Sequence, residues 1–424
     1  MITHIDQSSL RKGIRTELFP IRAVLKRFSN PQDRILTVHC AGTNGKGSTL
    51  AFLEKILLTA GYRTGLYTSP HLENITERIR VNGCSISNTD LSLLLVHIQR
   101  ICRSLNFKLT YFEYLTVAAF LYFKEQHVDV GLIETGMGGR WDATNVIASP
   151  VVSIITSIAR DHEQFLGSTL AQIAREKAAI IKKHSNVVCG PMPNGAITAM
   201  VHTVCTMQQS RLYMWGRDFS AEQGQTGIRY IRRPDNHIEG QISLKGRHQC
   251  INAACAMTAA SALNNTGRFT ITNTHKQYGI AHTEWPARYE PKTWRINDRL
   301  FHITIDGAHN PAAVHALVRL LKETGMKKQG LIFGALKDKN YASMLRMLVP
   351  VCNPIICMPI AHERGESAEK LGSLVKKIFP HKQVIIARSW TDCARTMAQY
   401  RIAHYIVTGS FYLAGELYAY LKKG

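Results

Sequence analysis

A glycine-rich turn that follows an apolar run near the N-terminus constrains this chain more than any other feature. Residues 34–40 are apolar enough to form a buried strand, and residues 48–60 carry apolar side chains at helical spacing. Between them lies Gly42-Thr-Asn-Gly-Lys-Gly-Ser48. Glycines let backbone N–H groups curve around an anion, and the N-terminus of the next helix carries partial positive charge. Strand, glycine turn and helix in this order predict a phosphate-binding loop within an α/β domain.

The loop departs from the usual G-x-x-x-x-G-K-[ST] pattern, because Cys40 stands at the first glycine and Gly47 separates Lys46 from Ser48. It nevertheless keeps a lysine that can reach the β- and γ-phosphates and a hydroxyl that can hold Mg²⁺. A tight glycine turn that binds nothing is the alternative interpretation. The predicted contacts with the cofactor ATP are Thr43, Asn44, Gly45, Lys46, Gly47 and Ser48.

Length, apolar runs and cysteine spacing limit the class of protein. With 424 residues the chain exceeds the size at which a single core keeps growing, so we expect at least two domains. No stretch approaches the ~18 to 20 apolar residues that a membrane span needs, and the N-terminal run with Asp6, Arg11 and Lys12 lacks a signal-peptide core. We therefore expect a soluble, cytoplasmic protein. Its ten cysteines include no CxxC pair, which indicates buried, reduced thiols.

The net charge of +22 raises the question of a nucleic-acid partner. Lys and Arg are, however, spread along the whole sequence and form no tail or tract. A positive field of this kind also attracts ATP and substrates with several carboxylates. We therefore predict small anionic substrates and no specific nucleic-acid or membrane partner.

Apolar runs and helical periodicities alternate along the first two thirds of the chain, which predicts a parallel sheet covered by helices. Two prolines within residues 285–291 indicate a boundary, after which a second alternation begins. The predicted architecture is a P-loop ATPase domain over residues 1–290 and a smaller Rossmann-like α/β domain over residues 291–424, with the active site in the cleft between them. The strand candidates of the first domain are 35–40, 63–67, 128–134 and 150–157, and its helix candidates are 48–60, 88–105, 113–126, 169–182 and 249–264.

Further sequence blocks occur in the order seen in one enzyme family. The loop Gly42–Ser48, followed by Thr68-Ser-Pro-His-Leu72, resembles folylpolyglutamate synthase and dihydrofolate synthase, which belong to the Mur ligase superfamily of ATP-dependent amide-bond formers. The resemblance spans nearly the whole chain. Its other blocks are Phe112–Thr116, Glu134–Asn145, Asp161–Lys177, His248–Asn252, Asp306–Pro311, Ala335–Lys339 and Thr408–Ser410.

The resemblance implies a monomeric, ATP-dependent ligase that joins L-glutamate to dihydropteroate, to a reduced folate, or to both. Attack of the acceptor carboxylate on the γ-phosphate would give an acyl phosphate, which the glutamate amine displaces. Two alternatives stay open at this point. One is a peptidoglycan-type Mur ligase with a nucleotide-sugar substrate, and the other is a basic P-loop ATPase that depends on nucleic acid.

Metal ligands are expected where carboxylates follow sheet strands. Glu134 ends an apolar strand and precedes a glycine turn, so we expect its carboxylate to face the phosphate loop. The resemblance implies two Mg²⁺ sites: Glu134, His162 and Ser69 bind one ion, and Ser48 serves the ion of the nucleotide. From the residues alone, Glu134 could equally be a solvated carboxylate at a strand end.

Lys177 lies fifteen residues after His162 on a helical run. The resemblance implies that CO₂ carbamylates this lysine, which turns a cation into an anionic group that bridges metal ions. It also implies catalytic roles for Lys46, Lys177 and His309. From the residues alone, Lys177 could be a surface partner of a neighbouring glutamate.

Two blocks resemble the pterin contacts of bacterial dihydrofolate synthases, where an aromatic face stacks on the ring and a carboxylate accepts its N–H groups. Phe112 could instead belong to the core of a helix. Asp142 has no obvious capping partner in the sequence, which favours a contact with substrate. The residues of these blocks are Thr110, Tyr111, Phe112, Glu113, Trp141, Asp142 and Ala143.

The second half of the chain resembles the region that, in family members, binds the nucleotide and the incoming glutamate. Asn252, Arg288, and Asp306 with His309 match nucleotide contacts, and Ser410, again with His309, is a candidate contact for glutamate. Because Arg288 and Asp306 lie on opposite sides of the predicted boundary, we expect domain closure to assemble this part. A helix cap for Ser410 and a turn for Asp306 are the alternatives.

The chain departs from the family pattern at several positions. Alanine replaces glycine at Ala179 and at Ala287, a change that is mild unless φ must be positive. Ala159-Arg160 precedes Asp161 where the family usually has glycine, and Leu18–Arg22 differs from the usual Leu-Gly-Leu-Glu-Arg.

Overall fold

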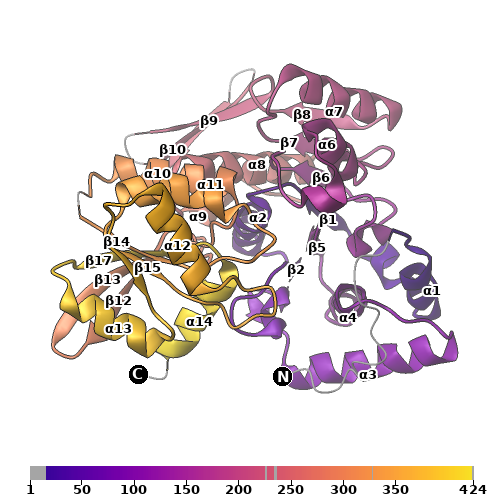
Figure 1. The fold of residues 1–424 in the computed structure, drawn as a ribbon. Helices are drawn as coiled ribbons and strands as arrows, with labels where there is room; N and C mark the ends of the chain where they lie inside the picture. Colours follow the sequence, from indigo (N-terminus) through magenta and orange to yellow (C-terminus); the bar gives the residue numbers. More distant parts are fainter. Residues whose placement is uncertain (1–15, 225–226, 234–235, 327, 423–424) are drawn as a thin grey trace. The chain divides into compact units, whose positions relative to one another are not determined.

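The computed structural model describes residues 16–224, 227–233, 236–326 and 328–422, so the N-terminal run with Asp6, Arg11 and Lys12 lies outside the described residues. The chain divides into two compact units (Figure 1). Unit 1 runs to residue 283, except for two short segments, 71–74 and 244–247, which belong to unit 2 together with the residues from 284 onward. Within the described ranges, no helix is long and apolar enough to cross a membrane.

Unit 1 is built on an eight-stranded sheet with the order β4-β3-β2-β5-β1-β6-β7-β8. Strands β2, β5, β1, β6, β7 and β8 run parallel, as predicted for this sheet, although β7 and β8 were not among the strand candidates; β3 and β4 add an antiparallel edge. These two strands are too short to show a periodicity in the sequence, which is why the edge was not expected. The strands are β1 (Thr37–Ala41), β2 (Thr64–Tyr67), β3 (Ile79–Val81), β4 (Cys84–Ser85), β5 (Val130–Glu134), β6 (Val152–Ile155), β7 (Asn186–Cys189) and β8 (Arg211–Met214).

Helices cover this sheet and form two apolar clusters. One cluster joins α1, α3 and α4 through side chains such as Leu25, Ile98 and Phe120, and the other includes residues of α6 and α7 (Figure 1). The helices of unit 1 are α1 (Phe19–Arg27), α2 (Lys46–Thr59), α3 (Asn88–Ser104), α4 (Tyr111–Glu125), α5 (Glu163–Leu166), α6 (Leu170–Ala178), α7 (Gly195–Met207), α8 (Arg247–Asn264) and α9 (Asn273–Ala281), with 3₁₀ turns η2 (Pro31–Arg34), η3 (Ile75–Arg78) and η4 (Ala143–Val146).

A small antiparallel sheet, formed by a polar, glycine-bearing stretch, precedes α8. Its order is β11-β10-β9, with β9 (Phe219–Gln223), β10 (Ile228–Arg232) and β11 (Asn236–Gly240). Helix α8 is rich in alanine and buried over most of its length, so small side chains let it pack closely.

Unit 2 has a six-stranded sheet with the order β12-β13-β17-β14-β15-β16. Only β12 is antiparallel to its neighbour, and the other pairs are parallel, in agreement with the predicted Rossmann-like alternation. Its elements are β12 (Glu290–Ile296), β13 (Arg299–Ile305), α10 (Pro311–Glu323), β14 (Gly330–Phe333), α11 (Tyr341–Leu348), η5 (Val349–Val351), β15 (Ile355–Cys357), α12 (Ala368–Ile378), β16 (Val384–Ile386), α13 (Trp390–Gln399), β17 (His404–Thr408) and α14 (Phe411–Leu421).

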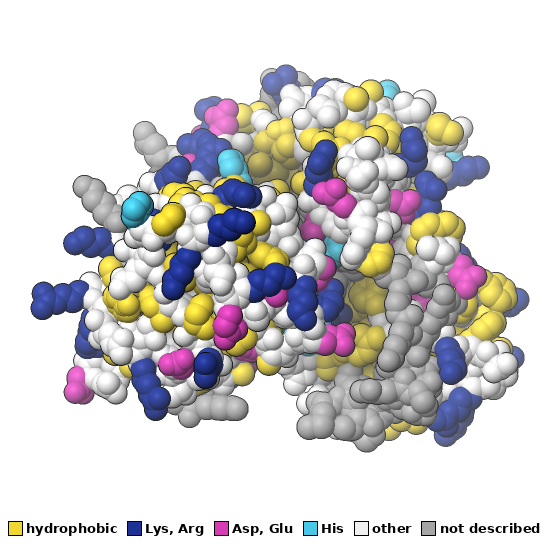
Figure 2. All heavy atoms as spheres, in the orientation of Figure 1, with side chains coloured by type: hydrophobic (Ala, Val, Ile, Leu, Met, Phe, Trp, Pro, Cys, Tyr) yellow, Lys and Arg dark blue, Asp and Glu magenta, His cyan; other side chains and the backbone are white. Residues whose placement is uncertain are grey.

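The spread of basic side chains and the burial of the cysteines agree with the expectations from the sequence, with one exception. On the face drawn in Figure 2, Lys and Arg side chains are scattered among hydrophobic, polar and acidic ones. All ten cysteines are free thiols, and nine are buried. The expectation of burial is wrong for Cys84, which is exposed because β4 lies at the edge of the sheet.

Candidate active site

The glycine loop leaves the carboxyl end of β1, which lies between β5 and β6 in the sheet. Gly45 has a φ of 89°, a left-handed conformation that glycine adopts readily, and α2 begins at the next residue. A Cβ atom on Gly45 would lie 2.3 Å from Oδ1 of Asn252 on α8. The structure therefore brings Asn252 against the loop and explains why only glycine fits at position 45.

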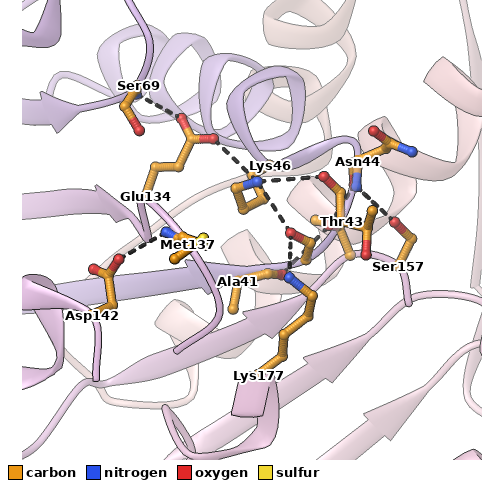
Figure 3. A network of polar contacts seen from close by, with 12 residues as sticks. Ala41, Thr43, Asn44, Lys46, Ser69, Glu134, Met137, Asp142, Ser157 and Lys177 are labelled. Carbon is orange, nitrogen blue, oxygen red and sulfur yellow. Dashed lines mark hydrogen bonds and ion pairs between the residues drawn. The ribbon is translucent and has the colours of Figure 1, made fainter. Parts of the chain in front are cut away.

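Residues that follow β6 hold the loop in place (Figure 3). The Asn44 backbone N–H donates to Ser157 Oγ at 3.0 Å, and Thr156 Oγ1 donates to the Asn44 carbonyl at 2.7 Å. Thr43 exchanges two hydrogen bonds with the backbone of Ala159 through its hydroxyl. Thr156 and Ser157 were not predicted from the sequence, although polar residues at the carboxyl end of a neighbouring parallel strand are a usable signal.

Two lysines point at the same carbonyl group of the loop. Nζ of Lys46 lies 3.1 Å from the Gly42 oxygen, and Nζ of Lys177 lies 3.0 Å from it (Figure 3). Lys177 is buried, so the alternative of a surface lysine is wrong. Burial, reinforced by the cation of Lys46, lowers the pKa of Lys177 to about 7. This arrangement concentrates positive charge at the loop.

The carboxylate of Glu134 faces the same loop, as predicted. Its Oε1 lies 3.7 Å from Nζ of Lys46, and its Oε2 accepts a hydrogen bond of 3.2 Å from the Ser69 N–H. Glu134 is only 5% exposed, so the alternative of a solvated carboxylate at a strand end is wrong. Ser48 is buried in the first turn of α2.

His162 lies in the loop that follows β6 and precedes α5. Its backbone is left-handed, with a φ of 52°, and its N–H donates to Oδ1 of Asp161 at 2.9 Å. Within the residues that the structure describes, no three side chains of His, Cys, Asp or Glu gather to hold a metal ion. A metal site here thus depends on other donors, such as the serine hydroxyls.

The block at residues 110–113 begins helix α4. Thr110 and Glu113 form a capping box, in which the Thr110 N–H donates to Oε2 of Glu113 at 2.6 Å and the Glu113 N–H donates to Oγ1 of Thr110 at 3.2 Å. Phe112 packs against the core and stacks on Tyr67, with ring centroids 5.7 Å apart. Tyr111 is partly exposed, and its ring meets the guanidinium of Arg78.

The expectation that Asp142 lacks a capping partner is wrong. Oδ1 of Asp142 accepts hydrogen bonds from the N–H and hydroxyl of Thr144 and caps the 3₁₀ turn η4, while Oδ2 accepts from the Met137 N–H at 2.8 Å (Figure 3). Burial raises the pKa of this carboxyl group. Its neighbour Trp141 is exposed, whereas Ala143 is buried.

A buried histidine extends this network to the strand before the phosphate loop. Nε2 of His39 lies 2.8 Å from Oγ1 of Thr144, which donates to Asp142, so Nε2 carries the proton and donates to the hydroxyl. Burial, with a contribution from Lys182, lowers the pKa of His39 to about 3. The pairing of His39 with Thr144 was not predicted, because nothing in the sequence distinguishes a buried polar pair from ordinary strand and turn residues.

In unit 2, four of the predicted residues gather at the carboxyl ends of β13 and β17. Arg288 places its guanidinium carbon 4.8 Å from the centre of the Phe411 ring. Asp306 accepts hydrogen bonds from the N–H groups of Tyr289 and Ala308, each at 2.9 Å. Burial raises the pKa of Asp306, and Arg288 partly offsets that rise.

The expectation that domain closure joins Arg288 to Asp306 is wrong. Both residues lie in unit 2, since the division falls between residues 283 and 284. The physical reason is that β12, which begins two residues after Arg288, pairs along its length with β13, which ends just before Asp306. Arg288 and Asp306 are therefore placed together by one sheet.

His309 and Ser410 occupy neighbouring positions in the same unit. Nδ1 of His309 lies 2.8 Å from the Gly307 carbonyl, and its ring lies 5.2 Å from that of Phe411, centre to centre. Ser410 caps α14 by accepting a hydrogen bond from the Tyr412 N–H, and Asp306 forms the turn with Ala308. The helix cap of Ser410 and the turn of Asp306, which were the alternative interpretations, are thus both present.

The two alanines that replace glycine differ in conformation. Ala179 follows α6 with a φ of −67°, which any residue adopts. Ala287 has a φ of 55°, in the left-handed region that favours glycine. The replacement is therefore mild at Ala179 and strained at Ala287.

Comparison with known proteins gives matches along the chain. Residues 40–260 match the Mur ligase middle domain, and residues 293–411 match the Mur ligase glutamate ligase domain. The chain is 32% identical to the dihydrofolate synthase/folylpolyglutamate synthase of Bacillus subtilis, over 97% of this chain and 96% of that relative.

Solved structures share the fold. Escherichia coli FolC in complex with DHPP and ADP has a TM-score of 0.86 at 27% identity, covering 100% of this chain and 96% of that one. The bifunctional folylpolyglutamate synthase/dihydrofolate synthase of Yersinia pestis, complexed with AMPPNP and Mn ion, has a TM-score of 0.84 at 27% identity, covering 99% and 96%.

Proposed function

The chain belongs to the dihydrofolate synthase/folylpolyglutamate synthase family of Mur ligases, and we propose that it joins L-glutamate to dihydropteroate, to a reduced folate, or to both, at the expense of ATP. The observation that carries this proposal is the phosphate loop with two lysines and one buried carboxylate directed at it. A tight turn that binds nothing would not need such a concentration of buried charge.

The reaction needs an activated carboxyl group, because oxide is a poor leaving group. The acceptor carboxylate attacks the γ-phosphorus of ATP, ADP leaves, and an acyl phosphate forms. The glutamate amine then attacks the acyl carbon, loses a proton and expels phosphate, which leaves the amide. We propose that Lys46, which lies beside the Gly42 carbonyl, neutralises charge that develops on the transferred phosphoryl group.

Divalent metal fits the donors near the loop. The proposed donors are the Glu134 carboxylate, which faces the loop, and the Ser48 and Ser69 hydroxyls and His162 imidazole that the family resemblance implies; they include the hard oxygen ligands that Mg²⁺ prefers. When bound, the metal would supply charge neutralisation and orient the phosphates. We propose Ser48 for the nucleotide's ion and Glu134, Ser69 and His162 for a second ion.

Carbamylation of Lys177 belongs to the same proposal. Only a neutral amine attacks CO₂, and a pKa of about 7 leaves a large neutral fraction at physiological pH. The product, an anionic carbamate, would replace a cation next to Lys46 by an attractive partner. It would also add oxygen donors to the Glu134 carboxylate and the serine hydroxyls proposed as metal ligands.

The acceptor site is proposed around the loops before α4 and after β5. The exposed aromatic rings of Tyr111 and Trp141 are available to a flat heterocycle, and Phe112 lies beneath the glycine turn at Gly136. Asp142 is held by Thr144 and Met137, so its orientation is fixed before substrate binds. The proposed acceptor contacts are Thr110, Tyr111, Phe112, Glu113, Trp141, Asp142 and Ala143.

The other nucleotide and glutamate contacts are proposed in both units. Asn252, Arg288 and Asp306 are assigned to the nucleotide, and His309 and Ser410 to glutamate. The relatives argue against a peptidoglycan-type ligase, because they are named for folate enzymes. The domain boundary at 290/291, the monomeric state, the cytoplasmic location and the absence of a nucleic-acid partner stay predictions.

A ligation assay with two acceptors tests the proposed function. Purified protein is incubated with ATP, Mg²⁺ and glutamate, and with either dihydropteroate or tetrahydrofolate. We expect ADP, phosphate and a glutamylated product with at least one acceptor. Failure with both acceptors, in protein that binds nucleotide, would refute the proposal, and ATP hydrolysis stimulated by DNA would favour the nucleic-acid alternative.

A further inference from the structure

Two strained residues flank Arg288. Ala287 has a φ of 55° and Tyr289 a φ of 50°, so both lie in the left-handed region although neither is glycine. Such a conformation is unfavourable for residues other than glycine, because the Cβ atom crowds the backbone carbonyl oxygen. It persists only where the surrounding structure imposes it, and such strain is concentrated at functional sites.

One side of this turn is held by a tyrosine and a glutamate. The Ala287 N–H donates to Oε2 of Glu290 at 2.9 Å and lies 3.2 Å from the hydroxyl of Tyr418. The Tyr418 hydroxyl itself donates to Oε2 of Glu290. Nζ of Lys292 lies 2.8 Å from the other oxygen of that carboxylate, which fixes its orientation.

The other side of the turn is held by the end of β13. The Tyr289 N–H donates to Oδ2 of Asp306, and the Gly307 N–H donates to the Ala287 carbonyl at 3.0 Å. The backbone on both sides of Arg288 is therefore fixed by hydrogen bonds. Because this backbone is fixed, the direction in which the Arg288 side chain leaves the turn is fixed as well.

Helix α14 supports the turn at two points. Phe411 and Tyr418 are seven residues apart in α14, so they lie on the same face two turns from each other. Phe411 contacts the guanidinium of Arg288, and Tyr418 contacts the backbone of Ala287. One helix face thus determines both the path of the turn and the position of its side chain.

We propose that Tyr418 and Glu290 are positioning residues for nucleotide binding: they hold the strained turn 287–289 so that the Arg288 guanidinium is pre-organised for a phosphate group. This inference rests on the proposed role of Arg288 as a nucleotide contact. Neither residue needs to touch the nucleotide. A pre-organised guanidinium loses less conformational freedom on binding, and the gain appears as affinity for ATP.

The test measures the dissociation constant of ATP·Mg²⁺ by titration calorimetry on the full-length protein. Tyr418→Phe removes only the hydroxyl, and we expect affinity to fall about tenfold, with the KM for the acceptor unchanged. Tyr405→Phe is the matched control, since it removes a buried hydroxyl of unit 2 that has no hydrogen-bond partner. It should leave ATP affinity unchanged.

A second pair of variants guards against a general loss of folding, which thermal melting would reveal. Glu290→Gln keeps an oxygen that can accept from the Ala287 N–H, so it should retain more ATP affinity than Glu290→Ala. Equal ATP affinity in Tyr418→Phe and Tyr405→Phe, or in the two Glu290 variants, would overturn the inference. If Arg288→Ala leaves ATP binding unchanged, the assignment of Arg288 is wrong, and the inference fails with it.

Discussion

The phosphate loop of unit 1 and the Arg288 turn of unit 2 bring backbone into left-handed conformations in two different ways. In the loop, the positive φ falls on Gly45, where it costs little, and a neighbouring side chain excludes any larger residue. In the turn, the positive φ values fall on Ala287 and Tyr289, and the half-buried carboxylate of Glu290 and the hydroxyl of Tyr418 impose them. The same kind of geometry is thus encoded locally in one unit and by tertiary contacts in the other.

The two regions also differ in how their charged side chains are paired. At the loop, Lys46 and Lys177 of α6 both point at the Gly42 carbonyl. Glu134 lies close to Lys46 but not to Lys177. In unit 2, Arg288 lies near Asp306, whose carboxylate is already occupied by two backbone N–H groups. We therefore expect substitutions at the loop to affect chemistry more than substitutions at the turn.

The largest expected effect is that of Lys46→Ala. Loss of the cation beside the transferred phosphoryl group should lower kcat by about 10³-fold or more. Lys55→Ala, on the same helix, is the matched control and should keep wild-type activity. Comparable kcat values for the two variants in the ligation assay would contradict the role given to Lys46.

Lys177→Ala should also abolish turnover, and short carboxylic acids such as acetate should restore part of it by standing in for the carbamate. The physical reason is that the alanine leaves a space next to the metal donors that a small anion can fill. Lys183→Ala, an exposed neighbour, should be fully active without any added acid. An inactive Lys177→Ala that no carboxylic acid rescues would contradict carbamylation.

A third prediction concerns pH and the buried network of unit 1. The pKa of His39 is about 3 in the folded protein against 6.5 unfolded, so the unfolded state alone binds this proton between those values. Stability should therefore fall as pH drops below about 6.5, by up to ~1.4 kcal/mol per pH unit from this group. Urea unfolding at several pH values should show a smaller loss in His39→Gln.

The control for this experiment is His315→Gln, on the exposed side of α10, which should keep the wild-type dependence on pH. If wild type and His39→Gln lose stability in parallel as pH falls, the burial of a neutral imidazole does not contribute to acid sensitivity.

The smallest expected effect tests whether the positive φ at Ala287 costs stability. Ala287→Gly should stabilise the protein by about 1 kcal/mol, because glycine adopts a positive φ without the clash of Cβ. Ala179→Gly, at a negative φ, should destabilise it by about 0.5–1 kcal/mol. If both variants change the free energy of chemical unfolding with the same sign, the backbone conformation does not explain the effect of glycine at the two sites.

The sequence predicts the phosphate loop, the central strands and most helices well, because each has a local pattern. It fails where contacts come from distant segments. The cap of Asp142, the placement of Arg288 in unit 2 and the strain at Ala287 all depend on partners that no local rule identifies. The short strands β3 and β4 were missed for the complementary reason that they contain too few residues to show a period.

Transfer of heavy oxygen tests the central claim most directly. The acceptor is prepared with labelled oxygen in the carboxyl group that receives glutamate, and the phosphate released during ligation is analysed by mass spectrometry. Passage through an acyl phosphate predicts one labelled oxygen in each phosphate formed, in proportion to the amide. Unlabelled phosphate accompanying labelled amide would contradict the account.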